Sequence, residues 1–132
     1  MLQVTKQKES VGYALGRIYA VCERVEWLVN RSNGKRFWQN WDVASTRPKE
    51  RFARLIVNFN NNLRLLKTDA TREYFKRIIN DSLQCIVDFP DVLSLDNQGE
   101  FVLGYYHQIA AFKRPPAEFE VNVDEISVDE NA

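Results

Sequence analysis

The stretch Val11–Asn30, VGYALGRIYAVCERVEWLVN, has the longest regular apolar periodicity in the chain. Its apolar residues recur at alternating intervals of four and three, which places them on one side of an α-helix. They are Val11, Leu15, Ile18, Cys22, Val25 and Val29. Charged residues on another side complete an amphipathic helix that other helices must cover. These are Arg17, Glu23, Arg24 and Glu26.

Gly12 and Gly16 lie one turn apart in this predicted helix. Each glycine lowers helix stability by about 1 kcal/mol relative to alanine. In return, a second helix can approach the backbone closely at this point. We therefore expect the helix to lie inside a helical bundle.

The composition is that of one globular domain. The chain has 132 residues, of which 45% are hydrophobic, including eight Phe, five Tyr and three Trp. No apolar run approaches the roughly 18 residues of a membrane span, and the N-terminal MLQVTKQKES lacks the hydrophobic segment of a signal peptide. We expect a cytoplasmic protein with no membrane partner.

Cys22 and Cys85 both fall in apolar helical periodicity, which favours two reduced core residues over a disulfide.

Three further helices are predicted downstream. The first spans residues 46–66 with Pro48 in its first turn, the second begins at a cap at Thr68 or Asp69 and runs to residue 88, and the third spans residues 94–112. Residues 35–41, KRFWQNW, form either a short helix or an ordered loop. The fold class is therefore all-α, a four-to-five-helix bundle over residues 1–116. Apolar positions of the last helix include Leu95, Val102, Tyr106 and Ile109.

Residues 117–132 carry six acidic residues and no basic one. This composition favours an acidic, flexible C-terminal tail. Phe119, Val121 and Val123 alternate with polar residues, so a short strand added to a partner is the alternative.

Positive charge is concentrated in the middle of the chain. Residues 31–77 contain twelve basic and four acidic residues, and arginine outnumbers lysine eight to four. Arginine makes bidentate phosphate contacts that lysine cannot make. A basic block of this kind favours a polyanionic partner, although a solvated helix surface is the alternative.

Several of these cations share helix faces with amides and lie apart from the apolar stripes, an arrangement suited to binding a nucleic-acid backbone without reading bases. The candidate nucleic-acid-binding residues are Lys35, Arg36, Arg47, Arg51, Arg54, Arg72, Lys76 and Arg77. For Phe37, Trp38 and Trp41 we favour core packing over base stacking.

Residues suited to catalysis are few. His107 is the single histidine and the two cysteines are distant in sequence, which excludes zinc sites of the usual spacings. The sequence has no phosphate-binding glycine loop, nucleophile elbow or paired metal-binding histidines. A carboxylate pair assembled in three dimensions remains the enzymatic alternative. We expect no enzymatic activity, metal, cofactor or small-molecule substrate, and a structural, hydrogen-bonded role for His107.

Two segments resemble a known family. Residues 12–26, GYALGRIYAVCERVE, and residues 93–108, LSLDNQGEFVLGYYHQ, are similar to the C-terminal region of the large subunit of the subtype I-C CRISPR Cascade complex. Residues 44–48, ASTRP, and 52–56, FARLI, resemble a weaker pattern of the same family. The acidic tail is not part of that pattern. In this family the region is also made as a separate small subunit from an internal start codon, and a chain that opens at Met1 just ahead of the first helix looks like that product.

The resemblance implies a non-catalytic helical subunit that lines the crRNA filament and supports the R-loop. The implied partners are crRNA and target DNA, as guide–target duplex or displaced strand, together with the large subunit, the backbone subunits and further copies of the chain. One alternative is a helical adaptor that binds only protein, with its acidic tail docked on a basic partner. Another is an excised domain of the longer subunit.

Overall fold

The computed structural model describes residues 9–30 and 35–112, and for residues 35–38 it describes only the main chain. Within these ranges the chain is all-α, as the sequence predicts, and contains no strand. The expected boundary at residue 116 and the tail of residues 117–132 lie outside the described residues. The elements are α1 (Val11–Asn30), α2 (Lys35–Thr46), the 3-10 helix η2 (Pro48–Glu50), α3 (Phe52–Leu63), α4 (Asp69–Leu83) and α5 (Leu95–Phe112).

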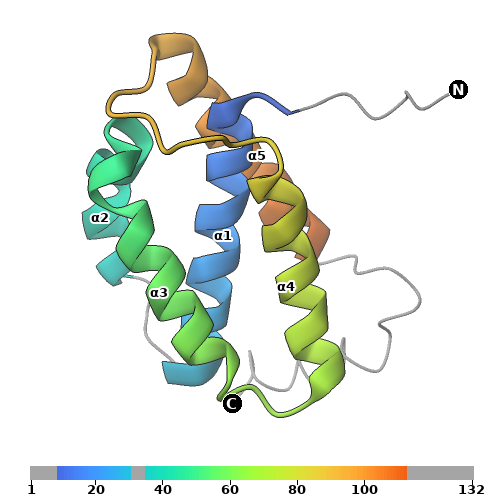
Figure 1. The fold of residues 1–132 in the computed structure, drawn as a ribbon. Helices are drawn as coiled ribbons and strands as arrows, with labels where there is room; N and C mark the ends of the chain where they lie inside the picture. The colour runs from blue at the N-terminus through green and yellow to red at the C-terminus, as the bar shows by residue number, and fades with distance from the viewer. Residues whose placement is uncertain (1–8, 31–34, 113–132) are drawn as a thin grey trace, which may run out of the picture.

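Helix α1 is the central element of the bundle (Figure 1). It packs most extensively against α5 and less extensively against α4, α3 and α2. Consequently 12 of its 20 residues are buried. The predicted apolar side is confirmed, but the charged outer side is wrong at Glu26, which is only 4% exposed. A helix surrounded by four others has little outer side left to expose.

The close approach predicted at Gly12 and Gly16 is confirmed, and α5 is the helix that uses it. A β-carbon at Gly12 would lie 2.1 Å from the carbonyl oxygen of Asn97. From the other side, a β-carbon at Gly104 would lie 2.1 Å from the carbonyl oxygen of Tyr13. The two helices therefore pack main chain against main chain along one seam.

Polar contacts also join the same two helices. Arg17 Nε donates a hydrogen bond to Gln108 Oε1 at 3.0 Å, and the guanidinium also pairs with Glu9. Arg17 and Gln108 belong to the two segments that carry the family resemblance. The two resembling segments, which are far apart in the sequence, therefore contact each other in the fold.

An aromatic cluster fills the core around Tyr19, which is 1% exposed. Its ring centroid lies 5.5 Å from that of Trp41, 5.7 Å from Phe101 and 6.2 Å from Tyr105. Core packing is thus confirmed for Trp41, which ties α2 to α1 and α5. The side chains of Phe37 and Trp38 lie outside the described residues.

The predicted helix over residues 46–66 is two elements, because Pro48 begins η2 and α3 starts only at Phe52. A proline disfavours helical dihedrals in the residue before it, and Arg47 accordingly has φ −132° and ψ 67°. Residues 35–41 are helical as part of α2. The predicted cap at Thr68 is confirmed, since its side chain accepts a hydrogen bond from Thr71 N at 3.1 Å.

Helix α4 ends at Leu83, several residues before the predicted end, and an irregular segment leads from there to α5. This segment crosses one end of the bundle beside α2 and η2 (Figure 1). Leu93 N donates to Thr46 O at 2.8 Å, and the Phe89 ring stacks on Phe52 at 5.5 Å. These contacts, rather than helix propensity, stabilise the crossing.

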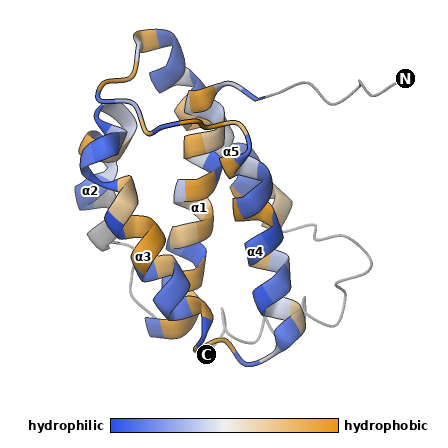
Figure 2. Cartoon of the chain, viewed as in Figure 1, coloured by the Kyte–Doolittle hydropathy of each residue, from blue (hydrophilic) through white to orange (hydrophobic). Residues whose placement is uncertain are grey.

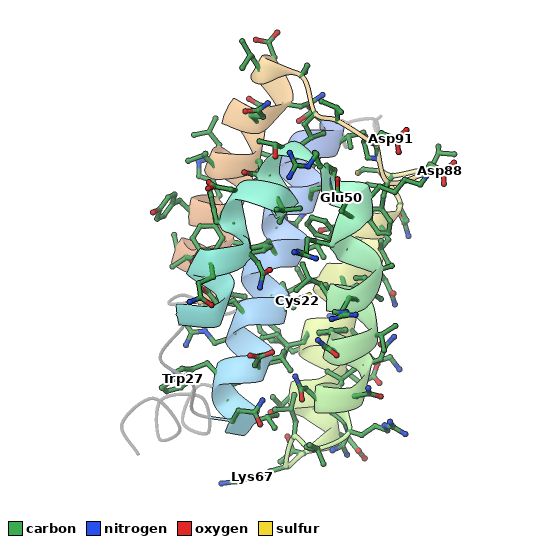
Figure 3. All side chains as sticks on the ribbon, turned by 90° about the vertical axis from the view of Figure 1, so that its left-hand side faces the viewer. Cys22, Trp27, Glu50, Lys67, Asp88 and Asp91 are labelled. Carbon is green, nitrogen blue, oxygen red and sulfur yellow. The ribbon has the colours of Figure 1, made fainter. Side chains whose placement is uncertain are left out.

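Both cysteines are free thiols, as predicted, but only Cys22 is a core residue, because Cys85 is half-buried beyond the end of α4. Cys22 lies in the middle of the bundle (Figure 3), where its Sγ is 3.8 Å from the carbonyl oxygen of Leu55. The pKa of the Cys22 thiol is raised, chiefly because the thiol is buried. Among the described helices, none is both long and apolar enough to cross a membrane.

Candidate nucleic-acid interface

Helix α3 separates an apolar side from a polar side. Its sequence FARLIVNFNNNL directs four residues into the core, namely Phe52, Leu55, Phe59 and Leu63. The remaining positions hold a cation, amides and smaller apolar residues. Residues 51–68 contain four basic residues and no acidic one. No carboxylate within the helix is therefore available to neutralise its cations.

The side turned away from the core is here called the α3 outer face. It consists of Arg54, Val57, Asn58, Asn61, Arg64 and Leu65, which lie on adjacent turns. Val57 and Leu65 are 57% and 67% exposed. A shallow hollow of about 430 Å³ lies on this face beside Ala53, Arg54, Val57 and Asn58.

The two arginines of this face have no carboxylate partner among the described residues. Arg54 is exposed and makes no hydrogen bond or ion pair there. Arg64 Nη2 donates to Asn61 Oδ1 at 2.8 Å, a bond to a neutral amide. Ten residues separate Arg54 from Arg64, or about 15 Å along a helix. Sequence reasoning selected Arg54 and missed Arg64, although the acid-free run of residues 51–68 could have indicated it.

Arg51 differs from Arg54. It precedes the first residue of α3 and is half-buried, with φ −122° and ψ −31°. Its Nε is buried and, within the described ranges, lacks a hydrogen-bond partner. Part of this guanidinium therefore belongs to the fold rather than to the surface.

Arg47 lies on the short segment before η2 and not on α3. Its Nε is 3.0 Å from Glu50 Oε2, and the two side chains are 51% and 57% exposed. Exposed pairs of this kind contribute less than about 1 kcal/mol, so a phosphate could replace the carboxylate. Lys35 and Arg36 begin α2, and their side chains lie outside the described residues.

The candidate cations of α4 are engaged within the structure. Arg72 pairs with Asp69 and also donates to the carbonyl oxygen of Leu66. Lys76 Nζ lies 3.6 Å from Glu73 Oε2, and the exposed Arg77 also interacts with a further group. Hydrophilic residues predominate along α4, whereas hydrophobic residues recur along α1 (Figure 2). Of the six candidates whose side chains the structure describes, only Arg54 therefore lies on a face that lacks carboxylates in the described chain.

A second surface, the α5 outer face, is apolar. It consists of Leu95, Gly99, Val102, Leu103 and Tyr106, and its four side chains are 83%, 40%, 48% and 54% exposed in that order. At Gly99, an added β-carbon would meet no other part of the described chain within 4 Å. The residues that α5 buries are others, namely Phe101, Gly104, Tyr105, Gln108 and Phe112. Three of the four apolar positions noted from the sequence thus face outward.

Two hydrogen bonds between titratable side chains join α1 and α5. Tyr13 Oη and His107 Nδ1 form a hydrogen bond of 2.6 Å, as expected for a structural histidine. Tyr105 donates a hydrogen bond to Glu23 Oε1, and burial raises the pKa of Glu23 although this hydrogen bond opposes the shift. Within the described residues, no three His, Cys, Asp or Glu side chains gather as a metal site would require.

The chain matches a known protein family. The sequence model of a family described as "CRISPR-associated protein (Cas_Csd1)" matches residues 1–113. The match includes the whole described bundle and both resembling segments. No curated protein matches the chain.

Proposed function

We propose, because this chain belongs to the Cas_Csd1 family of CRISPR-associated proteins, that it is a non-catalytic small subunit of a type I-C RNA-guided surveillance complex. In this role it supports the pairing of crRNA with target DNA. It binds the nucleic-acid backbone through the α3 outer face and neighbouring subunits through other helix faces.

The observation that carries this proposal is the arrangement of Arg54 and Arg64. Both are exposed, and neither pairs with a carboxylate in the described chain. Among the described residues, no ion pair has to be broken before either guanidinium binds a phosphate. A nucleic-acid backbone supplies phosphate oxygens for the two guanidiniums and for the amide donors of Asn58 and Asn61.

The spacing of the two arginines suits a backbone contact. Measured along the axis of a duplex, their separation of about 15 Å corresponds to about four base-pair steps, since each strand carries one phosphate per about 3.4 Å of axis. The α3 outer face has no aromatic residue on which bases could stack. These features favour binding that is independent of sequence, which a subunit serving many different guides requires.

The α5 outer face supports the second half of the proposal. Exposed apolar side chains that gather on one side of a helix, as Leu95, Val102, Leu103 and Tyr106 do, are typical of a protein interface. This face also favours the alternative function, an adaptor that binds only protein partners. The two functions differ in what the α3 outer face contributes.

An assembled complex separates them. Particles carrying guide RNA and either wild-type chain or the double variant Arg54→Ala, Arg64→Ala are compared for binding to target duplex DNA. The proposal predicts about tenfold weaker binding, which corresponds to about 1.4 kcal/mol. Lys49→Ala is the matched control, because Lys49 is exposed but lies 3.5 Å from Asp91, outside the α3 outer face. Equal binding by wild-type and double-variant particles of the same composition would favour the adaptor.

A further inference from the structure

The α3 outer face carries positive charge that the described fold does not balance. A further cation, Lys67, follows Arg64 in the turn that leads to α4, where it interacts with another group of the chain. Lys67 lies at one end of the bundle, whereas Glu50, Asp88 and Asp91 lie toward the other end (Figure 3). The acid-free segment of residues 51–68 thus reaches the end of the bundle where Lys67 lies.

The chain itself contains a segment of complementary charge. Residues 117–132 hold six acidic residues and no basic one. In this segment Phe119, Val121 and Val123 alternate with polar residues, and on the α3 outer face Val57 and Leu65 are exposed among cations and amides. The acidic segment and the α3 outer face therefore carry opposite charges, and both contain apolar side chains that could pack together.

The point where this segment leaves the bundle makes the contact feasible. Helix α5 ends at Phe112, whose ring lies 5.9 Å from that of Phe75 on α4. Phe75 is six residues from the start of α4, or about 9 Å along the helix, so Phe112 lies beside the N-terminal half of α4. Residues 113–132 span up to about 66 Å when extended. A covalent tether of this kind raises the local concentration of the acidic segment to the millimolar range.

We infer that residues 117–132 bind the α3 outer face when nucleic acid is absent, and that the acidic segment and nucleic acid exclude one another there. The inference deepens the proposed function and rests on it, since it assigns a competitor to the same arginines. A guide–target duplex, which has far more charges, displaces the segment. Short or weakly bound polyanions do not displace the segment.

The docking itself is tested without nucleic acid. A spin label is attached to Ser127→Cys in the full chain with Cys85→Ser, because Cys22 is only 3% exposed and resists labelling. The amide signals of Arg54 and Arg64 should broaden at low salt. The broadening should disappear at about 1 M salt, where the Debye length is about 3 Å, and in the Arg54→Ala, Arg64→Ala variant. Broadening confined to α5, or broadening that is independent of salt, would overturn the inference.

The competition is tested by binding of the isolated full chain to single-stranded DNA. Neutralising four acids of the segment, by Glu118→Gln, Glu120→Gln, Asp124→Asn and Glu125→Gln, should tighten binding about tenfold. The control neutralises four exposed acids of the bundle and so has the same net charge: Asp81→Asn, Asp88→Asn, Asp91→Asn and Asp96→Asn. Equal tightening in both variants would show a general charge effect and would contradict the competition. If no variant binds DNA, the proposed function fails, while the spin-label result still decides the docking.

Discussion

Gly16 of α1 touches the main chain of α5 at Phe101: a β-carbon on Gly16 would lie 2.1 Å from the Phe101 carbonyl oxygen. Because that neighbour is backbone, it cannot rotate away. Gly16→Ala should therefore force the two helices apart and destabilise the protein by about 3 kcal/mol or more. Urea unfolding followed by circular dichroism measures this loss.

Gly99→Ala is the matched control for that variant. Gly99 is also in a helix, but no atom of the described residues outside that helix turn lies within 4 Å of an added β-carbon. The alanine should stabilise the isolated chain by about 1 kcal/mol through helix propensity alone. Equal unfolding free energies for Gly16→Ala and wild type would show that the α1–α5 seam has room for a side chain, which contradicts the main-chain contact.

This seam shows what the sequence could and could not predict. The spacing of Gly12 and Gly16 predicts a close approach, but no local signal identifies α5 as the partner, since pairing depends on the whole fold. The same limit explains Glu26, which the helical period places outside and the surrounding helices bury. On α5, the apolar residues Val102 and Tyr106 face outward because Phe101 and Tyr105 occupy the seam.

The candidate site was predicted only in part, for a related reason. Charge counting finds the basic block but cannot tell which cations pair with neighbours three residues away. Arg47 and Arg72 each have such a partner, Glu50 and Asp69 respectively. Among the described residues, Arg64 bonds only to the amide of Asn61, and its importance becomes apparent once the acid-free residues around α3 are seen to share one face.

Arg72 and Arg64 should differ in their effect on stability. The Arg72 guanidinium bonds to the Leu66 carbonyl oxygen and pairs with Asp69, which holds the α3–α4 turn. Arg72→Ala should cost about 1 kcal/mol of unfolding free energy, whereas Arg64→Ala should change it by less than about 0.5 kcal/mol. Chemical denaturation of the two single variants checks this difference. A larger loss for Arg64→Ala would mean that Arg64 supports the fold.

Trp41 should hold α2 on the bundle. Its ring centroid lies 5.0 Å from those of both Phe101 and Tyr105 on α5. Trp41→Ala should speed hydrogen exchange throughout α2 while leaving the α1–α5 seam protected, because α2 has few other contacts with the core. Gln39→Ala, at an exposed position of the same helix, is the control. Uniform loss of protection in all helices would contradict this local role.

Glu23 should make stability depend on pH. Burial raises its pKa from the ordinary value of 4.5, so the folded protein binds this proton more tightly than the unfolded chain. The wild type should therefore gain stability relative to Glu23→Gln as pH falls from neutral toward 4.5, and lose that gain as pH rises. The glutamine carbonyl still accepts the Tyr105 hydrogen bond. A stability difference that is constant over this range would contradict the effect of burial.

The central claim is that Arg54 and Arg64 contact phosphates, and salt dependence tests it most directly. The logarithm of the affinity of the complex for target DNA is measured against the logarithm of salt concentration, for wild type and for Arg54→Ala, Arg64→Ala. Each phosphate contact contributes a slope of about 0.7–0.9, so the double variant should lose about 1.4–1.8. Identical slopes for wild type and double variant would contradict the claim.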